Sequence, residues 1–216
     1  MIMKKVATIL TVLFTACGTA FSQNGTWFCS EPGTVLSYVS SDASGAQTNS
    51  FQYIIKDVKK DGNATVISYD TVIPTVNAAP TGCTVRTEDG MFYTDASASM
   101  GQMGSNLQVS GNAPILPENP AVGQTLEDCS VSIASLATTV SYSKISFTRH
   151  EQITTPAGTF DAWCLEFTTN SKMAFVKAVN TNEQWFAKGV GVVKYVIKDK
   201  KGNVQSVQEL VKIEKP

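Results

Sequence analysis

The chain has 216 residues, with 17 Lys and Arg against 18 Asp and Glu, so its formal net charge is −1. Its one concentration of basic residues is the run Lys198-Asp199-Lys200-Lys201. We therefore expect neither a nucleic-acid partner nor binding to an anionic membrane surface, because both need a basic patch. A chain of this length can bury a single hydrophobic core.

The first 22 residues have the pattern of a secretory signal peptide. Lys4 and Lys5 precede an apolar run over residues 6–16, and Ala20-Phe21-Ser22 offers small residues where a signal peptidase cleaves. The apolar run is too short for a transmembrane span. We expect cleavage to leave residues 23–216 as a single β domain with a net charge of 15 − 18 = −3.

A rival processing site lies inside the same segment. Phe14-Thr15-Ala16-Cys17 resembles a bacterial lipobox, in which Cys17 would carry the lipid and become the new N-terminus. Both alternatives export the protein, either to the periplasm or to the outer membrane or cell exterior. The sequence leaves the choice between a soluble protein and a lipoprotein open.

The mature chain predicts short strands separated by tight turns. The strand-forming runs are residues 35–40, 51–58, 64–72, 83–87, 91–94, 129–135, 140–149, 160–168, 173–179, 184–187, 192–197 and 204–213. The turn residues between them include Gly62, Gly90 and Gly202, and glycine accepts the positive φ that a hairpin turn demands. Strands at this spacing favour a barrel, a curled sheet or a sandwich. We expect an all-β fold, a single antiparallel β-barrel or a strongly curled sheet of about 10–12 strands.

The strand pattern is interrupted between residues 95 and 126. The segment carries Pro114, Pro117 and Pro120, and an irregular segment of that length is typical of a functional loop. Its methionines adapt to irregular apolar partners, so the 95–126 loop either covers a ligand at the mouth of the sheet or plugs its end. The candidate ligand contacts are Met100, Met103, Leu107, Trp163 and Trp185.

The stretch ITTPAGTFDAWCLEFTT, residues 153–169, predicts a turn followed by a half-buried strand. Pro156 and Gly158 occupy positions that they favour in a type I turn. Alternate residues of the strand share a face. We expect burial of the face with Trp163, Leu165 and Phe167, and not of the face with Ala162, Cys164 and Glu166.

Little in the sequence points to catalysis. The one histidine, His150, precedes Glu151, but adjacent strand residues face opposite ways and cannot act together as a catalytic pair. Cys164 and His150 would imitate a thiol hydrolase only if their strands pair. One histidine leaves no common set of transition-metal ligands, so we expect no metal and no cofactor. Thr71 is a candidate O-glycosylation site, because Asp70-Thr71-Val72 fits an Asp-Ser/Thr-apolar pattern.

Four cysteines follow the leader, at positions 29, 83, 129 and 164. Export to an oxidising compartment favours disulfides, and four cysteines allow three connectivities. Buried free thiols are the alternative. None of the four belongs to a Cys-x-x-Cys pair, so we expect neither redox exchange nor a zinc ribbon.

Two stretches resemble a known family. EQITTPAGTFDAWCLEFTT, residues 151–169, and EQWFAKGVGVVKYVIKDKKGNVQSVQELVKI, residues 183–213, resemble exported Bacteroidota proteins labelled TapB-like or DUF3108-like. The resemblance implies a β-rich envelope protein of unknown function and brings no catalytic residues. It also favours a disulfide between Cys29 and Cys83. A Cys129–Cys164 bridge is disfavoured, because we expect a third strand to hold them about 10 Å apart, and a disulfide needs Cα atoms within about 7 Å.

These patterns support three functional hypotheses. The first is a non-catalytic binding module of the cell envelope for an apolar small molecule or a polymeric ligand. The second is a structural or assembly protein that binds another envelope protein through a sheet edge or through the 95–126 loop. A Cys/His hydrolase is the third and the least favoured.

Overall fold

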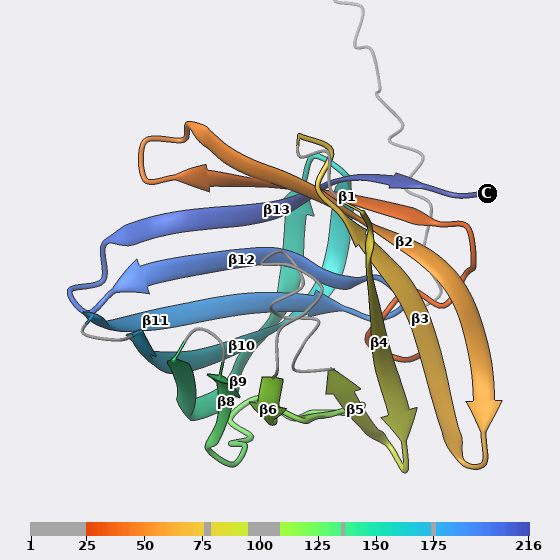
Figure 1. Cartoon of the computed structure of the whole chain (residues 1–216), viewed down its shortest axis with the longest axis horizontal. Coiled ribbons are helices and arrows are strands. Elements are labelled where there is room, and N and C mark those ends of the chain that lie inside the picture. The colour runs from red at the N-terminus through yellow and green to blue at the C-terminus, as the bar shows by residue number, and fades with distance from the viewer. Residues whose placement is uncertain (1–24, 76–78, 95–108, 135–136, 174–175) are drawn as a thin grey trace, which may run out of the picture.

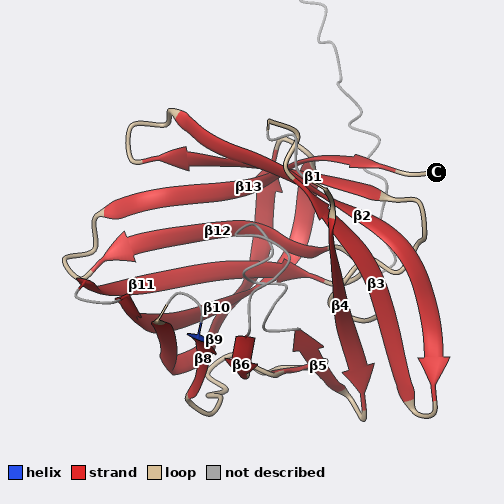
Figure 2. Ribbon diagram, in the orientation of Figure 1, coloured by secondary structure: helices blue, strands red, loops and turns tan. Residues whose placement is uncertain are grey.

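The computed structural model of the chain describes residues 25–75, 79–94, 109–134, 137–173 and 176–216. Most of these residues lie in β-strands (Figure 2). The strands are β1 (Val35–Asp42), β2 (Gln47–Asp61), β3 (Ala64–Val72), β4 (Thr81–Glu88), β5 (Met91–Thr94), β6 (Val109–Gly111), β7 (Leu116–Pro117), β8 (Cys129–Ile133), β9 (Thr138–Thr155), β10 (Gly158–Met173), β11 (Val176–Ala187), β12 (Gly191–Asp199) and β13 (Val204–Glu214). Every strand pair is antiparallel, which confirms the predicted all-β antiparallel class.

The strands form one 13-stranded sheet in the order β6-β8-β9-β10-β11-β12-β13-β1-β2-β3-β4-β5-β7. The sheet curls strongly, so that strands from its two ends lie near each other (Figure 1). Its end strands β6 and β7 do not pair with each other within the described residues. The curled sheet is therefore the correct alternative and the closed barrel is not, and the sheet has one strand more than the predicted range.

The hairpins lie where the sequence predicts them. Gly62, Gly90 and Gly202 have φ values of 58°, 74° and 87° and lie in the turns between β2 and β3, β4 and β5, and β12 and β13. Thr155 pairs with Gly158 across the Pro-Ala turn that joins β9 to β10. These turns are local, so the residues in them decide their position.

A short segment joins the two ends of the sheet. Residues 109–117, which we call the strap, begin as β6 on the edge of β8 and end as β7 on the edge of β5. From Gly111 to Leu116 the chain spans at most about 18 Å. The predicted irregular loop over 95–126 is thus wrong for residues 109–111 and 116–117, which pair with the two edge strands. Residues 112–115 between them are irregular as predicted, and residues 95–108 lie outside the described part.

Gly111 fixes the start of the strap. Its φ is +90°, and a Cβ built there would lie 2.1 Å from the backbone oxygen of Ser130 on β8. Only glycine allows this close approach of two backbones at a positive φ. The sequence pattern gave no strand here because the segment is short and its burial is decided by distant strands.

Burial along β10 differs from the prediction. Leu165 and Phe167 are buried as expected, but Ala162 and Cys164 are also fully buried, and Trp163 is only partly so. The buried side therefore changes from one face to the other between residues 164 and 165. The register with β9 shifts at this same place, and a bulge of this kind bends the strand pair so that its two faces meet different parts of the core.

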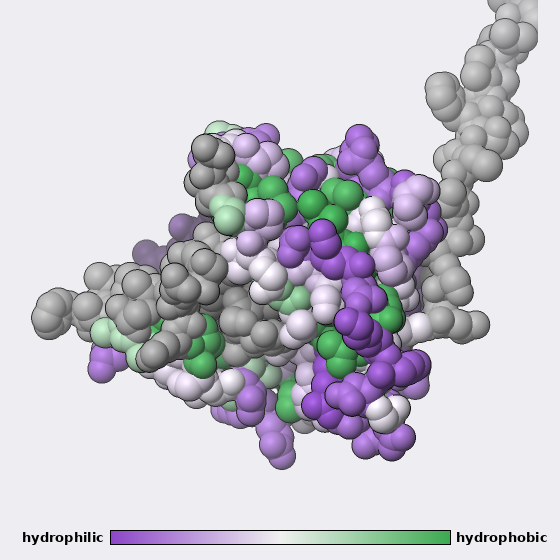
Figure 3. Space-filling model, turned by 45° about the vertical axis from the view of Figure 1, so that its right-hand side comes forward, coloured by the Kyte–Doolittle hydropathy of each residue, from purple (hydrophilic) through white to green (hydrophobic). Residues whose placement is uncertain are grey.

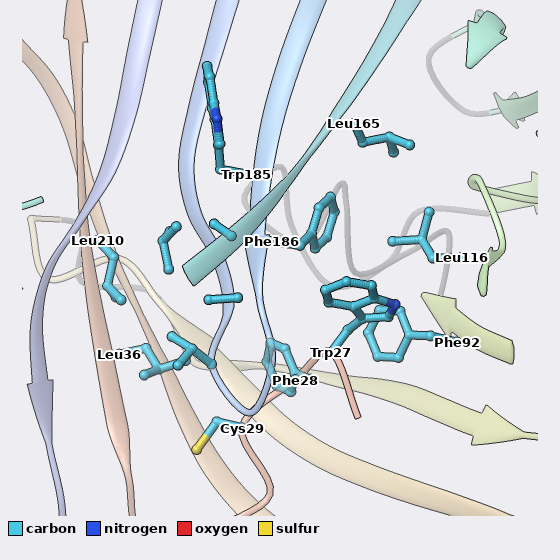
Figure 4. Packing of buried hydrophobic residues seen from close by; sticks show 14 of the residues in the cluster. Trp27, Phe28, Cys29, Leu36, Phe92, Leu116, Leu165, Trp185, Phe186 and Leu210 are labelled. Carbon is cyan, nitrogen blue, oxygen red and sulfur yellow. The ribbon is translucent and has the colours of Figure 1, made fainter. Parts of the chain in front are cut away.

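The core extends to the residues that follow the predicted leader. Trp27, Phe28 and Cys29 are 0%, 6% and 7% exposed and belong to the same hydrophobic cluster as the sheet. Figure 4 shows Trp27 beside Phe92 and Leu116. The folded domain thus begins a few residues after the predicted cleavage site.

The face of the molecule in Figure 3 is largely polar where its residues are described, with separate apolar patches. In the part of the chain that the structure describes, no helix is long and apolar enough to cross a membrane.

Candidate functional site

The inner face of the curled sheet holds a cavity of about 400 Å³. Nine of the described residues that line it are aromatic, and none of the described lining residues is charged. The aromatic residues are Phe28, Tyr38, Tyr53, Tyr69, Phe92, Tyr142, Phe167, Phe186 and Tyr195. A wall of this kind suits an apolar molecule.

The strand register sets the order of side chains along the cavity. Gln184 on β11 lies opposite both Leu165 on β10 and Tyr195 on β12, and all three line the cavity. One step along, Asn182 lies opposite Phe167. Each strand thus contributes alternate residues to one continuous wall.

Aromatic rings pack against one another along one side of the cavity. The ring centroid of Tyr38 lies 4.9 Å from that of Phe51 and 5.2 Å from that of Tyr53. Tyr53 lies 5.0 Å from Tyr69, which lies 4.8 Å from Phe28. Burial raises the pKa of Tyr38 and of Tyr53, so both phenols stay protonated at neutral pH.

Asn182 is the centre of a hydrogen-bond network in the wall. It is 1% exposed, and its Nδ2 donates to Thr169 Oγ1 at 3.0 Å and to the Asn180 carbonyl at 3.2 Å. Its Oδ1 accepts from the Tyr195 hydroxyl at 2.8 Å. Burial raises the pKa of Tyr195, so this hydroxyl remains a donor. The polar groups here are satisfied by the protein itself.

The strap forms another part of the wall. Ala113, Pro114 and Leu116 line the cavity. Part of the 95–126 segment therefore borders the cavity, and its contact with a ligand stays a prediction. Met100, Met103 and Leu107 lie outside the described residues.

The two tryptophans predicted as ligand contacts lie elsewhere than in this wall. Trp163 stacks on His150, with ring centroids 4.1 Å apart and an interplanar angle of 8°. Trp185 donates its indole N–H to Glu151 Oε1 at 2.9 Å. In Figure 4 it points away from the side chains around Trp27.

Arg149 covers Cys164 and links three carboxylates. Its Nη2 donates to Cys164 Sγ at 3.0 Å and its Nη1 to Glu166 Oε1 at 2.7 Å. It also pairs with Glu151 at 3.1 Å and with Glu183 at 3.4 Å. Burial raises the pKa of the Cys164 thiol to about 11. The thiol is thus held protonated, which is the opposite of what a nucleophile needs.

The register keeps His150 and Cys164 apart. β9 and β10 do pair, but Cys164 lies opposite Arg149 while His150 lies opposite Trp163. Neighbouring residues of a strand face opposite ways, so the imidazole and the thiol leave the hairpin on different faces. The imidazole Nε2 lies 2.9 Å from Asp161 Oδ1 instead. Among the described residues, no group of three or more His, Cys, Asp or Glu could hold a metal ion.

All four thiols fall in the described ranges, and the structure forms no disulfide between them. β9 separates β8, which carries Cys129, from β10, which carries Cys164, as the sequence predicts. The Cys29–Cys83 bridge stays a prediction. So does O-glycosylation of Thr71, which is 4% exposed with its Oγ1 3.6 Å from Cys83 Sγ, so the sugar would have to be added before β3 packs.

The protein is therefore of the class built on one strongly curled antiparallel sheet, and in this chain the sheet holds an aromatic-lined cavity. It belongs to the DUF3108-like family, which it matches over residues 31–210, as the resemblance predicted. The TapB-like label stays a prediction.

Two solved structures share the fold. A candidate exported protein with YmcC-like fold from Bacteroides fragilis NCTC 9343 superposes with a TM-score of 0.74 at 18% identity, covering 88% of this chain and 100% of that one. A candidate lipoprotein from Parabacteroides distasonis ATCC 8503 has a TM-score of 0.73 at 19% identity, covering 88% of this chain and 99% of that one. No curated protein matches the chain.

Proposed function

We propose that this protein is an exported, non-catalytic binding protein that holds an apolar small molecule inside its curled sheet. The observation that carries the proposal is the cavity of about 400 Å³, which has many aromatic residues and no charged residue among the part of its lining that the structure describes. Its volume falls in the range of ligand sites, about 300–1,000 Å³. A cavity of this size takes a small molecule whole but only one end of a polymer.

Export is supported by the leader and by the structural neighbours. Lys4, Lys5 and the apolar run after them form a signal-like segment, and the neighbours are described as a candidate exported protein and a candidate lipoprotein. We place the protein in the cell envelope, with Cys17 as the lipid attachment site if the lipobox is the site processed.

The cavity wall favours binding over catalysis. The polar side chains among its described lining residues are amides and hydroxyls, and burial raises the pKa of Tyr53 and of Tyr195, which keeps these two phenols protonated. A general acid or base needs a pKa near the working pH. The assembly hypothesis has less support, because the sheet ends in strands of 3 and 2 residues, and short edge strands offer little to an added strand.

A neutral apolar dye tests the proposal. We expect N-phenyl-1-naphthylamine to bind residues 23–216 saturably, with a rise in fluorescence. Val192 lines the cavity, so Val192→Trp should weaken binding at least tenfold. Val204→Trp is the matched control, since Val204 is exposed on the adjacent strand β13.

Melting curves of both variants would show whether each one folds. Absence of saturable binding to the unsubstituted protein, or equal binding by a folded Val192→Trp variant, would refute the proposal. Native mass spectrometry of protein purified from a periplasm would add a direct test, because a bound ligand appears as extra mass that is lost on activation.

A further inference from the structure

Two glutamines of the cavity wall have side-chain amides that are open to a ligand. Gln184 on β11 and Gln208 on β13 both line the cavity, and both are partly exposed. Neither amide forms a hydrogen bond within the described part of the chain. They differ in this from Thr34 Oγ1 and Tyr38 Oη, which also lack a partner but are closed off by burial. The two amides therefore keep free donors and acceptors.

The alternation of the strands places both side chains on the inner face of the sheet. On β11 the lining residues are every second one from position 180 to position 186, with Gln184 among them. On β13 Gln208 lines the cavity, whereas its neighbours Val207 and Glu209 do not. The exposed part of each glutamine thus belongs to the cavity side of its strand.

The register places the two glutamines on either side of one ring. β11, β12 and β13 are neighbours in the sheet (Figure 1). Tyr195 on β12 lies opposite Gln184 and opposite Gln208. Adjacent strands lie about 4.8 Å apart, so the two glutamines are separated by about 10 Å across this ring. We call Gln184, Tyr195 and Gln208 the amide row.

Within the amide row, the two amides are the groups left for a ligand. The Tyr195 hydroxyl already donates to Asn182 Oδ1 at 2.8 Å. A glutamine amide has two N–H donors and a carbonyl acceptor, so each amide can both donate to a ligand and accept from it. One polar group of a ligand cannot easily reach both amides across the ring, so it bonds to one of them.

The apolar surroundings of the amide row make it selective. Leu165 on β10 lies opposite Gln184, and both line the cavity with Phe186. A wholly apolar ligand that covers an amide there leaves it unsatisfied, which is unfavourable. A site with such groups therefore discriminates against a molecule that lacks the matching polar group.

We propose that Gln184 and Gln208 are the hydrogen-bonding contacts for the ligand, which is an uncharged molecule with an apolar body and a neutral amide or hydroxyl group. This inference rests on the proposed binding function and adds the class of ligand. The ligand is uncharged because no charged residue occurs among the described lining residues, and a charge buried without a partner is strongly unfavourable.

Three naphthalene compounds test the amide row. Naphthalene, 2-naphthamide and 2-naphthoate share one body, and the last two have nearly the same shape but differ in charge. Equilibrium dialysis against residues 23–216 at pH 7 gives a dissociation constant for each compound. We expect the two neutral compounds to bind, and 2-naphthoate to bind at least tenfold more weakly than 2-naphthamide.

The decisive quantity is the ratio of the naphthalene and 2-naphthamide dissociation constants. Methionine has nearly the length of glutamine without its amide, so in the double variant Gln184→Met/Gln208→Met this ratio should fall about three- to tenfold, the worth of one hydrogen bond. Gln52→Met/Gln205→Met is the matched control, because neither of these glutamines lines the cavity. It should keep the ratio of the unsubstituted protein.

A gain of binding provides a second test, which a loss of fold cannot imitate. Gln184→Lys and Gln208→Lys each introduce a cation into the amide row. At least one of the two should bind 2-naphthoate tenfold or more tightly than the unsubstituted protein does, because the lysine supplies the partner that the carboxylate lacks. Melting curves show which variants are folded.

The outcomes separate the two proposals. If neither neutral compound binds to the unsubstituted protein, the proposed function fails. If both bind but the folded double methionine variant keeps the full ratio, or neither folded lysine variant gains 2-naphthoate, the amide row is refuted and the binding function stands. Tighter binding of 2-naphthoate than of 2-naphthamide to the unsubstituted protein would refute the uncharged class of ligand.

Discussion

Trp27 should be one of the most costly residues to remove, although it lies just after the predicted leader. Its side chain is 0% exposed. Its ring stacks on Phe147 with centroids 6.3 Å apart and meets Phe186 edge-on at 6.0 Å. Its indole N–H donates to the carbonyl of Pro117 at 2.9 Å. One residue therefore ties the N-terminal segment, the strap and the sheet together.

The size of the effect follows from these contacts. Replacing a buried Trp by Ala costs about 3–5 kcal/mol through lost burial and the cavity that remains. The lost hydrogen bond leaves the Pro117 carbonyl without this donor and adds about 1 kcal/mol. We expect Trp27→Ala to lower the free energy of unfolding by about 4–6 kcal/mol, a large part of the 5–15 kcal/mol typical of a domain.

Urea unfolding of residues 23–216, followed by far-ultraviolet circular dichroism, measures this loss without relying on tryptophan fluorescence. Trp27→Phe keeps a ring but not the N–H donor, so its loss should be about 1–3 kcal/mol. Trp163→Ala is the control, since Trp163 is partly exposed and stacks on His150. A loss for Trp27→Ala below about 1 kcal/mol, or no larger than that for Trp163→Ala, would contradict the role of the N-terminal segment in the core.

Three further predictions concern the strap, the cavity wall and the buried thiol. Gly111→Ala should destabilise the protein by about 2–4 kcal/mol, because the new Cβ would lie 2.1 Å from a β8 carbonyl oxygen. Gly123→Ala is the control: its φ is +88° and its new Cβ would have no atom within 4 Å, so it should show only the backbone strain of about 1 kcal/mol. Equal losses of stability for the two variants in urea unfolding would count against the clash. Tyr195→Phe should cost about 1–3 kcal/mol, because it removes the donor to Asn182 Oδ1; an unchanged urea midpoint would show that this bond contributes nothing. Burial raises the pKa of Cys164 from 9.0 to about 11, so the stability that its protonated thiol contributes is present below pH 9 and lost toward pH 11. The difference in unfolding free energy between the unsubstituted protein and Cys164→Ala should therefore shift by about 2 kcal/mol over that range. A difference that stays constant with pH would contradict the raised pKa.

The strands and hairpins could be predicted because their signals are local. Alternating apolar residues mark a strand, and Gly62 or Gly90 marks a turn through a φ that other residues avoid. No distant residue is needed to recognise either one. The general class of the fold follows from counting such elements.

The wall of the cavity could not be predicted in the same way. Burial on β10 changes face after Cys164 because of a shift in register with β9, which depends on how another strand packs. Trp27 and Phe28 lie outside any strand pattern, and only their aromatic character could have suggested burial. Gln184 and Gln208 look like any other glutamines in the sequence, and only the register of β11, β12 and β13 brings them into one row.

The open sheet and the cavity have one physical origin. A small closed barrel fills its interior with side chains, whereas here the strap joins the ends of the sheet and the core fills one part of the interior. In that part Trp27 lies beside Phe92 and Leu116 (Figure 4). The remaining space keeps a wall of rings that already pack against neighbouring rings, as Tyr38 does against Phe51. If the proposed binding function holds, these rings need no ordering when a ligand enters, a cost that otherwise reduces affinity. The strap borders the same space without the alternation that a sheet strand requires, so substitutions there should change the proposed ligand preference while the sheet is kept.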